Sequence, residues 1–493
     1  MKNGTLLQYF HWYYPADESL WKKLRKDIPW LTSNGISAVW LPPAYKGIHG
    51  NQSIGYDTYD LFDLGEFDQK GSVHTKYGSR RDYLSAITAV QKAGLMVYVD
   101  IVVNHKGGAD EKERVKVWRV NPENRNEIQG DEFEIEAFTK FTFPGRDGKY
   151  SKYIWDFHSF TGVDYAADID ECGIFKINNE YGQSWEDEVS EEFGNYDYLM
   201  HADIEFRNPA VKEELKHWIS WYHKTAHFNG LRLDAVKHIP VYFFNEWLDY
   251  VRTHVQRDLF VVGEYWETTD VGILHRYIEA TGGRMQLFDA ILQNRFHIAS
   301  KCGKEFDMST IFNDTLVATK PENAVTIVAN HDTQPLQSLE APVEPWFKPL
   351  AYALILLRKD GYPCLFYPDA FGAHYWDKGN DGNDYEIFMP VVNKIEQMLK
   401  ARQQFAYGDQ QDFLDHPNCI GWVRNGDEEH AGCIVLMSNS EEGHKDINLG
   451  EDKKGWVYVD FLGNHEAEIT LDDHGNGKFL TKGGSVSVWV PKV

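Results

Sequence analysis

The sequence predicts an α/β protein: a (β/α)8 TIM barrel with an inserted irregular/β domain after strand 3 and a C-terminal antiparallel β-sandwich. Three observations carry this prediction. Apolar, strand-like runs alternate with helical patterns along most of the chain, a polar and aromatic stretch interrupts that alternation once, and short runs separated by turn residues follow after about residue 400. Helices between successive strands favour parallel strands, and eight such strands favour a closed barrel.

The first part of the barrel is expected to supply three strands, at residues 6–12, 36–41 and 95–103. Between the first two, Trp21, Leu24, Ile28 and Leu31 recur at helical spacing, and Asn34-Gly35 ends that helix. Ser79, with Asp82 three residues on, is typical of a capping box and opens a second helix that Gly94 ends.

Residues 106 to about 206 break the pattern, so they form either a separate small domain or a disordered segment. Their content of Trp, Tyr and Phe favours folded structure. The alternation resumes at Asn208-Pro209, where an N-cap precedes a proline in the first helical position. Five further strands are expected at residues 230–236, 259–264, 285–290, 324–329 and 362–367, with a helix at 346–358 before the last of them.

The C-terminal runs, near residues 419–423, 432–437, 456–461 and 485–490, are typical of an antiparallel sandwich. The expected domains are therefore a barrel built from residues 1–104 and 208–397, the insertion at 105–207, and the sandwich at 398–493.

The composition of the chain argues against some classes of binding partner. The chain has 493 residues and a formal net charge of −25, which argues against nucleic acid and anionic membranes because phosphate groups are bound by Lys and Arg. This acidity suits a neutral substrate, and it is explained equally well as a contribution to solubility. The high aromatic content of 14% fits either sugar stacking or large cores.

The five cysteines are odd in number and form no CxxC motif, which favours free thiols in a reducing compartment over a disulfide framework or a zinc site. The first residues lack the apolar run of a signal peptide. We therefore expect a cytoplasmic protein, although a secreted protein whose leader had been removed would look the same.

Polar groups recur where the apolar strands end. Asp100 and the pair Asn104-His105 follow one strand, Asp234 follows another, Glu264 a third, and Asn330-His331-Asp332 a fourth. In a parallel barrel these strand ends form one face, which holds the active site.

Three carboxylates on one face suit glycoside hydrolysis, which needs a nucleophile or base and a carboxylic acid that protonates the leaving oxygen. Asp234 is the expected nucleophile, because Arg232 leaves the strand on the same side and favours its ionised form. Glu264 follows an all-apolar strand, and an apolar setting suits a general acid. Asp332 is the expected third carboxylate. A single aspartate at a strand end is more often a cap than a catalyst, so the hypothesis rests on the group of acids together with Arg232.

These four segments resemble the four signature regions of the alpha-amylase family of retaining glycoside hydrolases, in the same order. Ile54-Gly-Tyr56-Asp57 and Asn195-Tyr-Asp197-Tyr-Leu-Met-His-Ala-Asp203 resemble further family segments. The likeness covers essentially the whole chain. It is strongest to bacterial liquefying-type enzymes, particularly their intracellular branch.

The resemblance implies roles for each residue. Asp234 is the expected nucleophile, Glu264 the acid/base and Asp332 the acid that distorts and stabilises the sugar. The other residues implied in substrate binding are Arg232, His105 and His331 as hydrogen-bonding groups, Tyr56 as stacking platform, Lys237 and His238 on the leaving-group side, and Asp100 as a supporting acid. Tyr56 and Lys237 could instead simply pack or face solvent.

The resemblance also implies one calcium ion between the barrel and the insertion, held by Asn104, Asp197, Asp203 and the main-chain oxygen of His238; oxygen-only ligands are what calcium takes. The two aspartates could instead belong to a solvated acidic face. Some secreted relatives bind further metals through a Trp-Asp-Trp-Glu segment, but this chain reads Trp185-Glu-Asp-Glu188. Chloride is not expected, because no basic residue closely follows Asp332.

The function implied is that of an endo-acting alpha-amylase that cleaves α-1,4 bonds in starch, glycogen and maltodextrins with retention. The alternatives are a maltooligosaccharide-forming hydrolase, a 4-α-glucanotransferase of the same fold and, more remotely, a non-catalytic glucan-binding member of the family. We expect a monomer.

Overall fold

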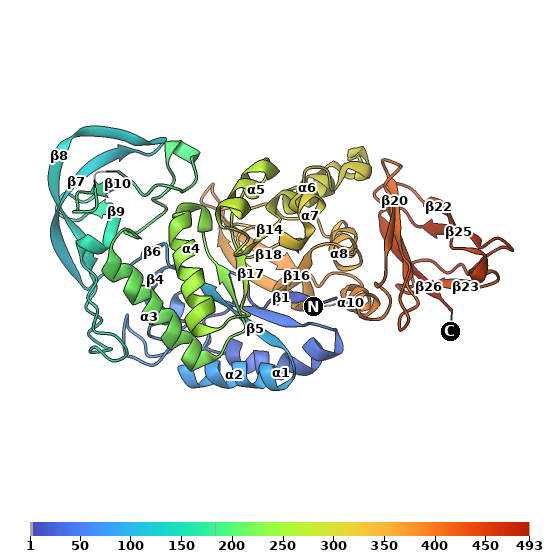
Figure 1. Cartoon of the computed structure of the whole chain (residues 1–493), viewed down its shortest axis with the longest axis horizontal. Coiled ribbons are helices and arrows are strands. Elements are labelled where there is room, and N and C mark those ends of the chain that lie inside the picture. Colours follow the sequence, from blue (N-terminus) through green and yellow to red (C-terminus); the bar gives the residue numbers. More distant parts are fainter. Residues whose placement is uncertain (1–2, 183, 493) are drawn as a thin grey trace.

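The barrel closes as predicted in this computed structural model, which describes residues 3–182 and 184–492. Eight parallel strands follow one another around the ring in the order β1-β16-β15-β14-β13-β12-β5-β2. The barrel lies between the inserted segment and the C-terminal strands (Figure 1). Their bounds are β1 (Leu6–Gln8), β2 (Ala38–Leu41), β5 (Met96–Ile101), β12 (Gly230–Leu233), β13 (Phe260–Gly263), β14 (Gln286–Phe288), β15 (Ala324–Ile327) and β16 (Tyr362–Phe366). Each predicted strand is present but shorter. In most of them the residues at the carboxyl end leave the sheet to form loops, whereas β2 is shortened at its amino end.

Ten α-helices accompany the described strands: α1 (Leu20–Ser33), α2 (Arg80–Lys92), α3 (Pro209–Ala226), α4 (Val241–Tyr250), α5 (Val271–Ala280), α6 (Ala290–Cys302), α7 (Leu316–Thr319), α8 (Lys348–Leu356), α9 (Tyr367–Phe371) and α10 (Ile395–Gln404). Two of the capping residues predicted from the sequence, Ser79 and Asn208, cap helices in the structure. The hydroxyl of Ser79 accepts the N–H of Asp82 at the start of α2, and the Asn208 side chain accepts the N–H of Ala210 at the start of α3. The predicted capping residues therefore fix where these two helices begin.

The inserted segment is a folded β domain, which settles the alternative left open by the sequence. Its six-stranded sheet has the order β6-β11-β9-β10-β7-β8. The strands are β6 (His105–Lys106), β7 (Glu111–Asn121), β8 (Asn124–Lys140), β9 (Phe160–Ala166), β10 (Glu171–Ile177) and β11 (Ala202–Ile204). β6 directly follows the Asn104 end of the barrel loop and pairs with β11, so His105 lies opposite Asp203. This pairing brings the insertion onto the carboxyl face of the barrel.

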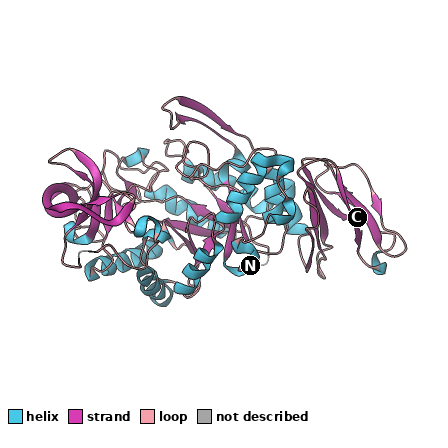
Figure 2. Ribbon diagram, turned by 90° about the horizontal axis from the view of Figure 1, so that it is seen from above, coloured by secondary structure: helices cyan, strands magenta, loops and turns pink. Residues whose placement is uncertain are grey.

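The C-terminal domain is an antiparallel sandwich with one large and one small layer (Figure 2). The large sheet has the order β19-β20-β21-β26-β23-β24, and β22 pairs with β25 against it. A separate apolar cluster that includes Phe479 and Trp489 fills the space between the layers. The strands are β19 (Gln410–Phe413), β20 (Cys419–Arg424), β21 (Cys433–Ser438), β22 (Gly443–Asn448), β23 (Val457–Asp460), β24 (Ile469–Thr470), β25 (Asn476–Thr481) and β26 (Ser485–Pro491).

Two features differ from the sequence prediction. The expected domain boundary at 397/398 falls inside α10, whose Arg402 is buried and bonds the carbonyl oxygens of Leu356 and Gly4 in the barrel. We therefore assign α10 to the barrel. An antiparallel hairpin, β17 (Ala373–Lys378) and β18 (Asp384–Met389), was not predicted. A further short pair, β3 (Lys46–Gly47) and β4 (Thr58–Asp60), lies in the loop after β2.

All five cysteines lie among the described residues and are free thiols, as the odd count predicted. Across residues 3–182 and 184–492, no helix is both long and apolar enough to cross a membrane.

Candidate active site

The site is organised by Arg232, the third residue of β12, whose guanidinium is almost fully buried. Nη1 donates to Asp100 Oδ1 at 2.8 Å and to Asp234 Oδ1 at 2.6 Å, and Nη2 donates to Glu264 Oε2. β12 pairs in parallel with β5 on one side and β13 on the other, so three neighbouring strands deliver these carboxylates to one cation. The sequence predicted the contact with Asp234, but not that the same guanidinium also holds Glu264.

Glu264 has the environment of a general acid. Burial raises the pKa of its carboxyl well above the ordinary value; Arg232 opposes this rise, and the charges of Asp234 and Asp332 add to it. A raised pKa keeps a carboxylic acid protonated near neutral pH, where it can donate its proton. The apolar strand that precedes Glu264 was therefore a valid sequence signal.

Asp332 lies in the same environment, and burial raises the pKa of its carboxyl to about 7, with Arg232 opposing the rise. Its main-chain N–H is held by Asn330 Oδ1 at 3.0 Å. The neighbouring His331 places Nε2 3.2 Å from Asp332 Oδ2, and its Nδ1 accepts from Gln8 Nε2 at 3.0 Å. Burial and Arg232 hold the pKa of His331 well below its usual range, so the neutral ring carries its proton on Nε2, toward Asp332.

A parallel set of rings forms one wall of the site. Tyr56 stacks on His331 with centroids 4.8 Å apart and an interplanar angle of 11°, and Trp12 lies nearly parallel to both rings. The Tyr56 hydroxyl donates to Asp100 Oδ2 at 2.8 Å, and the role of Tyr56 as a stacking platform for a sugar stays a prediction. Sequence reasoning missed Trp12 as a site residue because it was placed inside the first strand. An aromatic residue just beyond that strand's carboxyl end was the available signal.

Asp100 is a buried acid that contacts both Arg232 and Tyr56. It is fully buried, and its Oδ2 accepts from both the Trp40 indole at 2.9 Å and the Tyr56 hydroxyl. With Oδ1 bound by Arg232, both oxygens are used inside the protein. This geometry is that of an acid that orients Arg232 and Tyr56, and the supporting role expected of Asp100 stays a prediction.

Two histidines flank the acids as neutral rings. His105 donates from Nε2 to the Tyr56 carbonyl at 2.7 Å, and burial lowers its pKa to about 4. His238 donates from Nδ1 to the Tyr196 carbonyl at 2.8 Å, and burial lowers its pKa to about 3. Both bonds join a residue near the barrel rim to a loop beside the site, so they fix the ring orientations.

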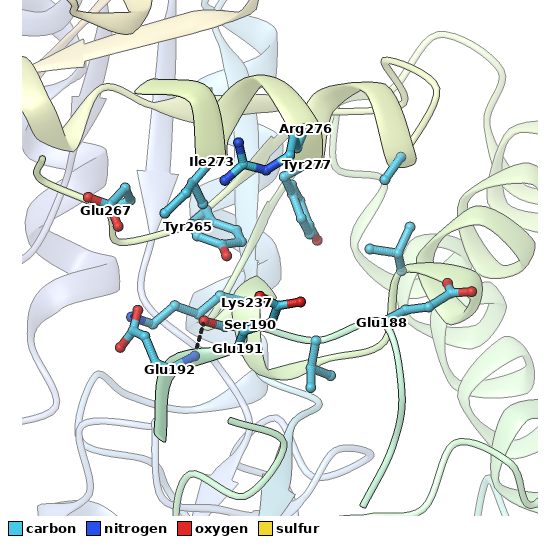
Figure 3. A pocket seen from close by; sticks show the side chains of 13 residues that line it. Glu188, Ser190, Glu191, Glu192, Lys237, Tyr265, Glu267, Ile273, Arg276 and Tyr277 are labelled. Carbon is cyan, nitrogen blue, oxygen red and sulfur yellow. Dashed lines mark hydrogen bonds and ion pairs between the residues drawn. The ribbon is translucent and has the colours of Figure 1, made fainter. Parts of the chain in front are cut away.

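A cavity of about 420 Å³ lies between α5 and residues 188–192 of the insertion, and its lining includes none of the acids Asp234, Glu264 and Asp332 (Figure 3). Lys237 stands at its edge, where Nζ donates to Glu192 Oε1 at 2.7 Å and to the Trp266 carbonyl at 3.3 Å. Tyr265 and Tyr277 face it from above in Figure 3. The contact of Lys237 with the leaving group stays a prediction, and in the structure its charge is paired with Glu192.

Three of the four expected calcium ligands, Asn104, Asp197 and Asp203, form a cradle of oxygens between β5 and the insertion. Asp203 accepts from Asn104 Nδ2 at 3.0 Å and from the Thr161 hydroxyl at 2.6 Å. Asn104 Oδ1 and Asp197 Oδ1 are buried and have no hydrogen-bond partner. Burial raises the pKa of Asp203 well above its ordinary value and that of Asp197 to about 7. Unpartnered buried oxygens beside two desolvated carboxylates fit a hard cation that takes oxygen ligands. The described residues contain no cluster of three or more His, Cys, Asp and Glu side chains placed to hold a metal.

Beside this group of oxygens, the buried acids Glu186 and Glu205 are hydrogen-bonded to Arg207. Arg207 binds Glu205 with two hydrogen bonds of 2.7 Å, and its main-chain N–H donates to Glu186 Oε1 at 3.0 Å. Burial, followed by the charges of Asp197 and Glu205, raises the pKa of Glu186 to about 9. Glu186 belongs to the segment that departs from the Trp-Asp-Trp-Glu pattern, and here it bonds Arg207 and the Tyr242 hydroxyl. A fixed guanidinium charge therefore stabilises this part of the insertion.

Comparison with known proteins agrees with this geometry. The family described as "Alpha amylase, catalytic domain" matches residues 21–416. The chain is 53% identical over 491 residues to the "Cytoplasmic alpha-amylase" of Escherichia coli (strain K12), with 99% of each chain covered. It is 47% identical to an "Alpha-amylase" of Geobacillus stearothermophilus, covering 99% of this chain and 87% of that protein. It is 44% identical to a "Glucan 1,4-alpha-maltohexaosidase" of Bacillus sp. (strain 707), covering 99% and 93%.

Solved structures share the fold. An alpha-amylase from Geobacillus thermoleovorans complexed with acarbose superposes with a TM-score of 0.66 at 17% identity, covering 100% of this chain and 98% of that one. The cyclomaltodextrin glucanotransferase CldA superposes with a TM-score of 0.64 at 18% identity, covering 100% of both chains. The sequence relatives, the matched catalytic-domain family and the three carboxylates around Arg232 lead to one conclusion: this chain belongs to the alpha-amylase family of glycoside hydrolases.

Proposed function

We propose that the protein is an endo-acting alpha-amylase that hydrolyses α-1,4-glucosidic bonds in starch, glycogen and maltodextrins with retention of configuration. The observation that carries the proposal is the shared guanidinium: Asp234 and Glu264 are bound to two terminal nitrogens of Arg232. This holds both carboxyl groups within the span of one side chain. A retaining enzyme needs its two carboxyl groups about 5–5.5 Å apart, whereas an inverting enzyme needs roughly 6.5–9.5 Å to admit a water molecule.

In the first step, Asp234 attacks the anomeric carbon while Glu264 gives its proton to the departing glycosidic oxygen, and a covalent glycosyl ester forms. In the second step, Glu264 takes a proton from water, and the water oxygen displaces Asp234. Arg232 stays charged throughout and keeps both carboxyl groups in place. His331 and Asp332 lie beside the Tyr56 platform, where they suit hydroxyl groups of the sugar that is being distorted.

Asn104, Asp197, Asp203 and the main-chain oxygen of His238 would hold one calcium ion. Its charge would neutralise the buried aspartates and join the insertion to the barrel. The support is the pair of unpartnered oxygens in the cradle. Metal analysis of the purified protein should find one calcium per chain, and Asp203→Asn should reduce that content; full calcium content in the variant would contradict the ligand set.

The relative named as a cytoplasmic enzyme and the five free thiols support a cytoplasmic location. A monomer remains our proposal, to be tested by sedimentation of the purified chain.

A time course of oligosaccharides released from soluble starch, with and without a chelator, tests the function. Early production of many chain lengths supports endo-hydrolysis. A single dominant product, as the name of the Bacillus sp. relative describes, would favour a maltooligosaccharide-forming enzyme. Products longer than the donor, formed from maltooligosaccharides, would favour a glucanotransferase. No change in any glucan would contradict the proposal and favour a binding protein.

A further inference from the structure

The unpredicted hairpin β17–β18 has two very different faces. Its inner face packs on the barrel: Tyr375 is buried and stacks on Tyr13 with centroids 3.9 Å apart. Tyr13 also donates its hydroxyl to Asp377 Oδ2 at 2.6 Å. Met389 completes a small apolar cluster with Ala329, just before the His331–Asp332 loop. The inner face therefore ties the hairpin to the segments that form the active site.

The outer face of the hairpin carries large exposed rings. Residues that lie opposite each other in an antiparallel pair point to the same face, and here His374 pairs with Phe388 and Trp376 with Glu386. Trp376 is 60% exposed and Phe388 65% exposed, the two largest fractions among the exposed large hydrophobic residues. The two are diagonal neighbours, about 7–8 Å apart in such a ladder. They thus form one exposed aromatic strip.

Hydrogen-bonding groups border this strip. His374 stacks on Phe388 at 4.2 Å with an interplanar angle of 8°, and its Nε2 donates to Glu386 Oε1 at 2.9 Å. Lys378 pairs with Asp384 at 3.0 Å in the next row. Lys378 and Asp384 form an ion pair, and Glu386 is hydrogen-bonded to His374, so two flat rings lie beside polar groups on this face. Such a surface suits a neutral ring-shaped ligand, because it offers aromatic rings to apolar C–H faces and hydrogen-bonding groups to hydroxyl edges.

The hairpin that carries the strip is joined, through its inner face, to a segment that also contributes to the active site. Trp12 lies in the aromatic wall of the site, and its neighbour Tyr13 lies under the hairpin. Residues 12–13 therefore contact the other rings of the active site through Trp12 and the hairpin through Tyr13. A long polymer bound at the acids has further glucose units available to a second surface on this part of the barrel, whereas a short oligosaccharide has few such units. The overall charge of −25 further disfavours nucleic acid or an anionic membrane as the occupant.

We propose that the outer face of the β17–β18 hairpin is a second carbohydrate-binding site, in which Trp376 and Phe388 stack on glucose units of a long α-glucan whose other part occupies the cleft. The proposal rests on the proposed function for the identity of the sugar. It assigns to this face a role in holding polymer and none in bond cleavage.

The test compares three full-length proteins: wild type, Trp376→Ala/Phe388→Ala, and the control Trp456→Ala, which removes an exposed aromatic ring of the C-terminal domain. Binding is measured as retardation in native gels that contain glycogen. Hydrolysis is measured on maltoheptaose. We expect the dissociation constant for glycogen to rise about tenfold in the double variant, which corresponds to about 1.4 kcal/mol, and to stay unchanged in the control. The rate on maltoheptaose should be unchanged in all three.

The aromatic-preserving pair Trp376→Tyr/Phe388→Tyr should keep most of the retardation, which separates ring stacking from a general effect on the fold. Equal retardation of wild type and the alanine variant would overturn the proposal. So would a wild-type dimer that the alanine variant loses without any change in retardation, because the face would then bind a second copy of the chain. Failure of the proposed function is distinguishable, since it would appear as absent hydrolysis of maltoheptaose by the wild type.

Discussion

Replacing Arg232 should impair both catalysis and stability. Its guanidinium is 1% exposed and binds three carboxylates, two of which are the reacting pair. A hydrogen bond between charged groups contributes about 1.5–3 kcal/mol, so the two bonds to Asp234 and Glu264 amount to about 3–6 kcal/mol. If these bonds hold the reacting geometry, Arg232→Met should lower kcat by about 10² to 10⁴-fold, at 1.36 kcal/mol per factor of ten. Stability should fall by about 3–5 kcal/mol, because buried charges lose their partner.

The same substitution should shift the pH dependence. Arg232 favours the charged form of Glu264 and so opposes the rise of that pKa. Removing the guanidinium raises the pKa of Glu264 further, so the acid keeps its proton to higher pH and the alkaline limb of the kcat profile moves to higher pH.

The assay is steady-state hydrolysis of a blocked chromogenic maltooligosaccharide from pH 5 to 10, with unfolding in urea as the stability measurement. Arg232→Lys is the matched variant, since it keeps the charge but cannot bridge two carboxylates with a planar fork. It should fall between wild type and Arg232→Met in rate. A lysine variant within threefold of wild type, with the same pH profile, would refute the bridging role.

Three further outcomes are expected. Asp234→Asn should abolish turnover while the protein stays folded, and more than about a tenth of the wild-type kcat would exclude Asp234 as the covalent nucleophile. Glu264→Gln should still bind substrate and should cleave an activated glycosyl fluoride much better than starch, because fluoride departs with little protonation; equal losses on both would count against Glu264 as the acid. Chelation should lower the unfolding temperature, since a ligand bound only by the folded state stabilises it, and an unchanged melting curve would argue against a structural calcium ion.

Polar residues at the ends of apolar strands can be identified from local sequence alone. This pattern identified most of the residues that the structure brings together in the site. Asp234 and Glu264 each follow the last residue of a short apolar strand, so their placement on one face needed only the barrel prediction. The shared use of Arg232 could not be predicted in this way, because it depends on the register of β12 against β13 and on which way a long side chain turns.

Contacts between segments that are far apart along the chain could not be predicted from the sequence either. Trp12 enters the site through its alignment with Tyr56 and His331, which are far away along the chain. The β17–β18 hairpin has exposed residues on one face and a Tyr375–Tyr13 contact on the other, so neither strand shows a clear apolar alternation. The expected boundary at 397/398 falls inside α10, which packs on barrel segments through Arg402, a polar residue that the apolar pattern does not reveal.

The stereochemistry of the first product tests the central claim most directly. Asp234 and Glu264 follow adjacent parallel strands and share one guanidinium, which is the arrangement of a retaining pair. Proton NMR of maltooligosaccharides in the first minutes of starch hydrolysis, before mutarotation, should therefore show the α-anomer at the new reducing end. Initial accumulation of the β-anomer would contradict the assignment of Asp234 as nucleophile and the retaining mechanism proposed for this protein.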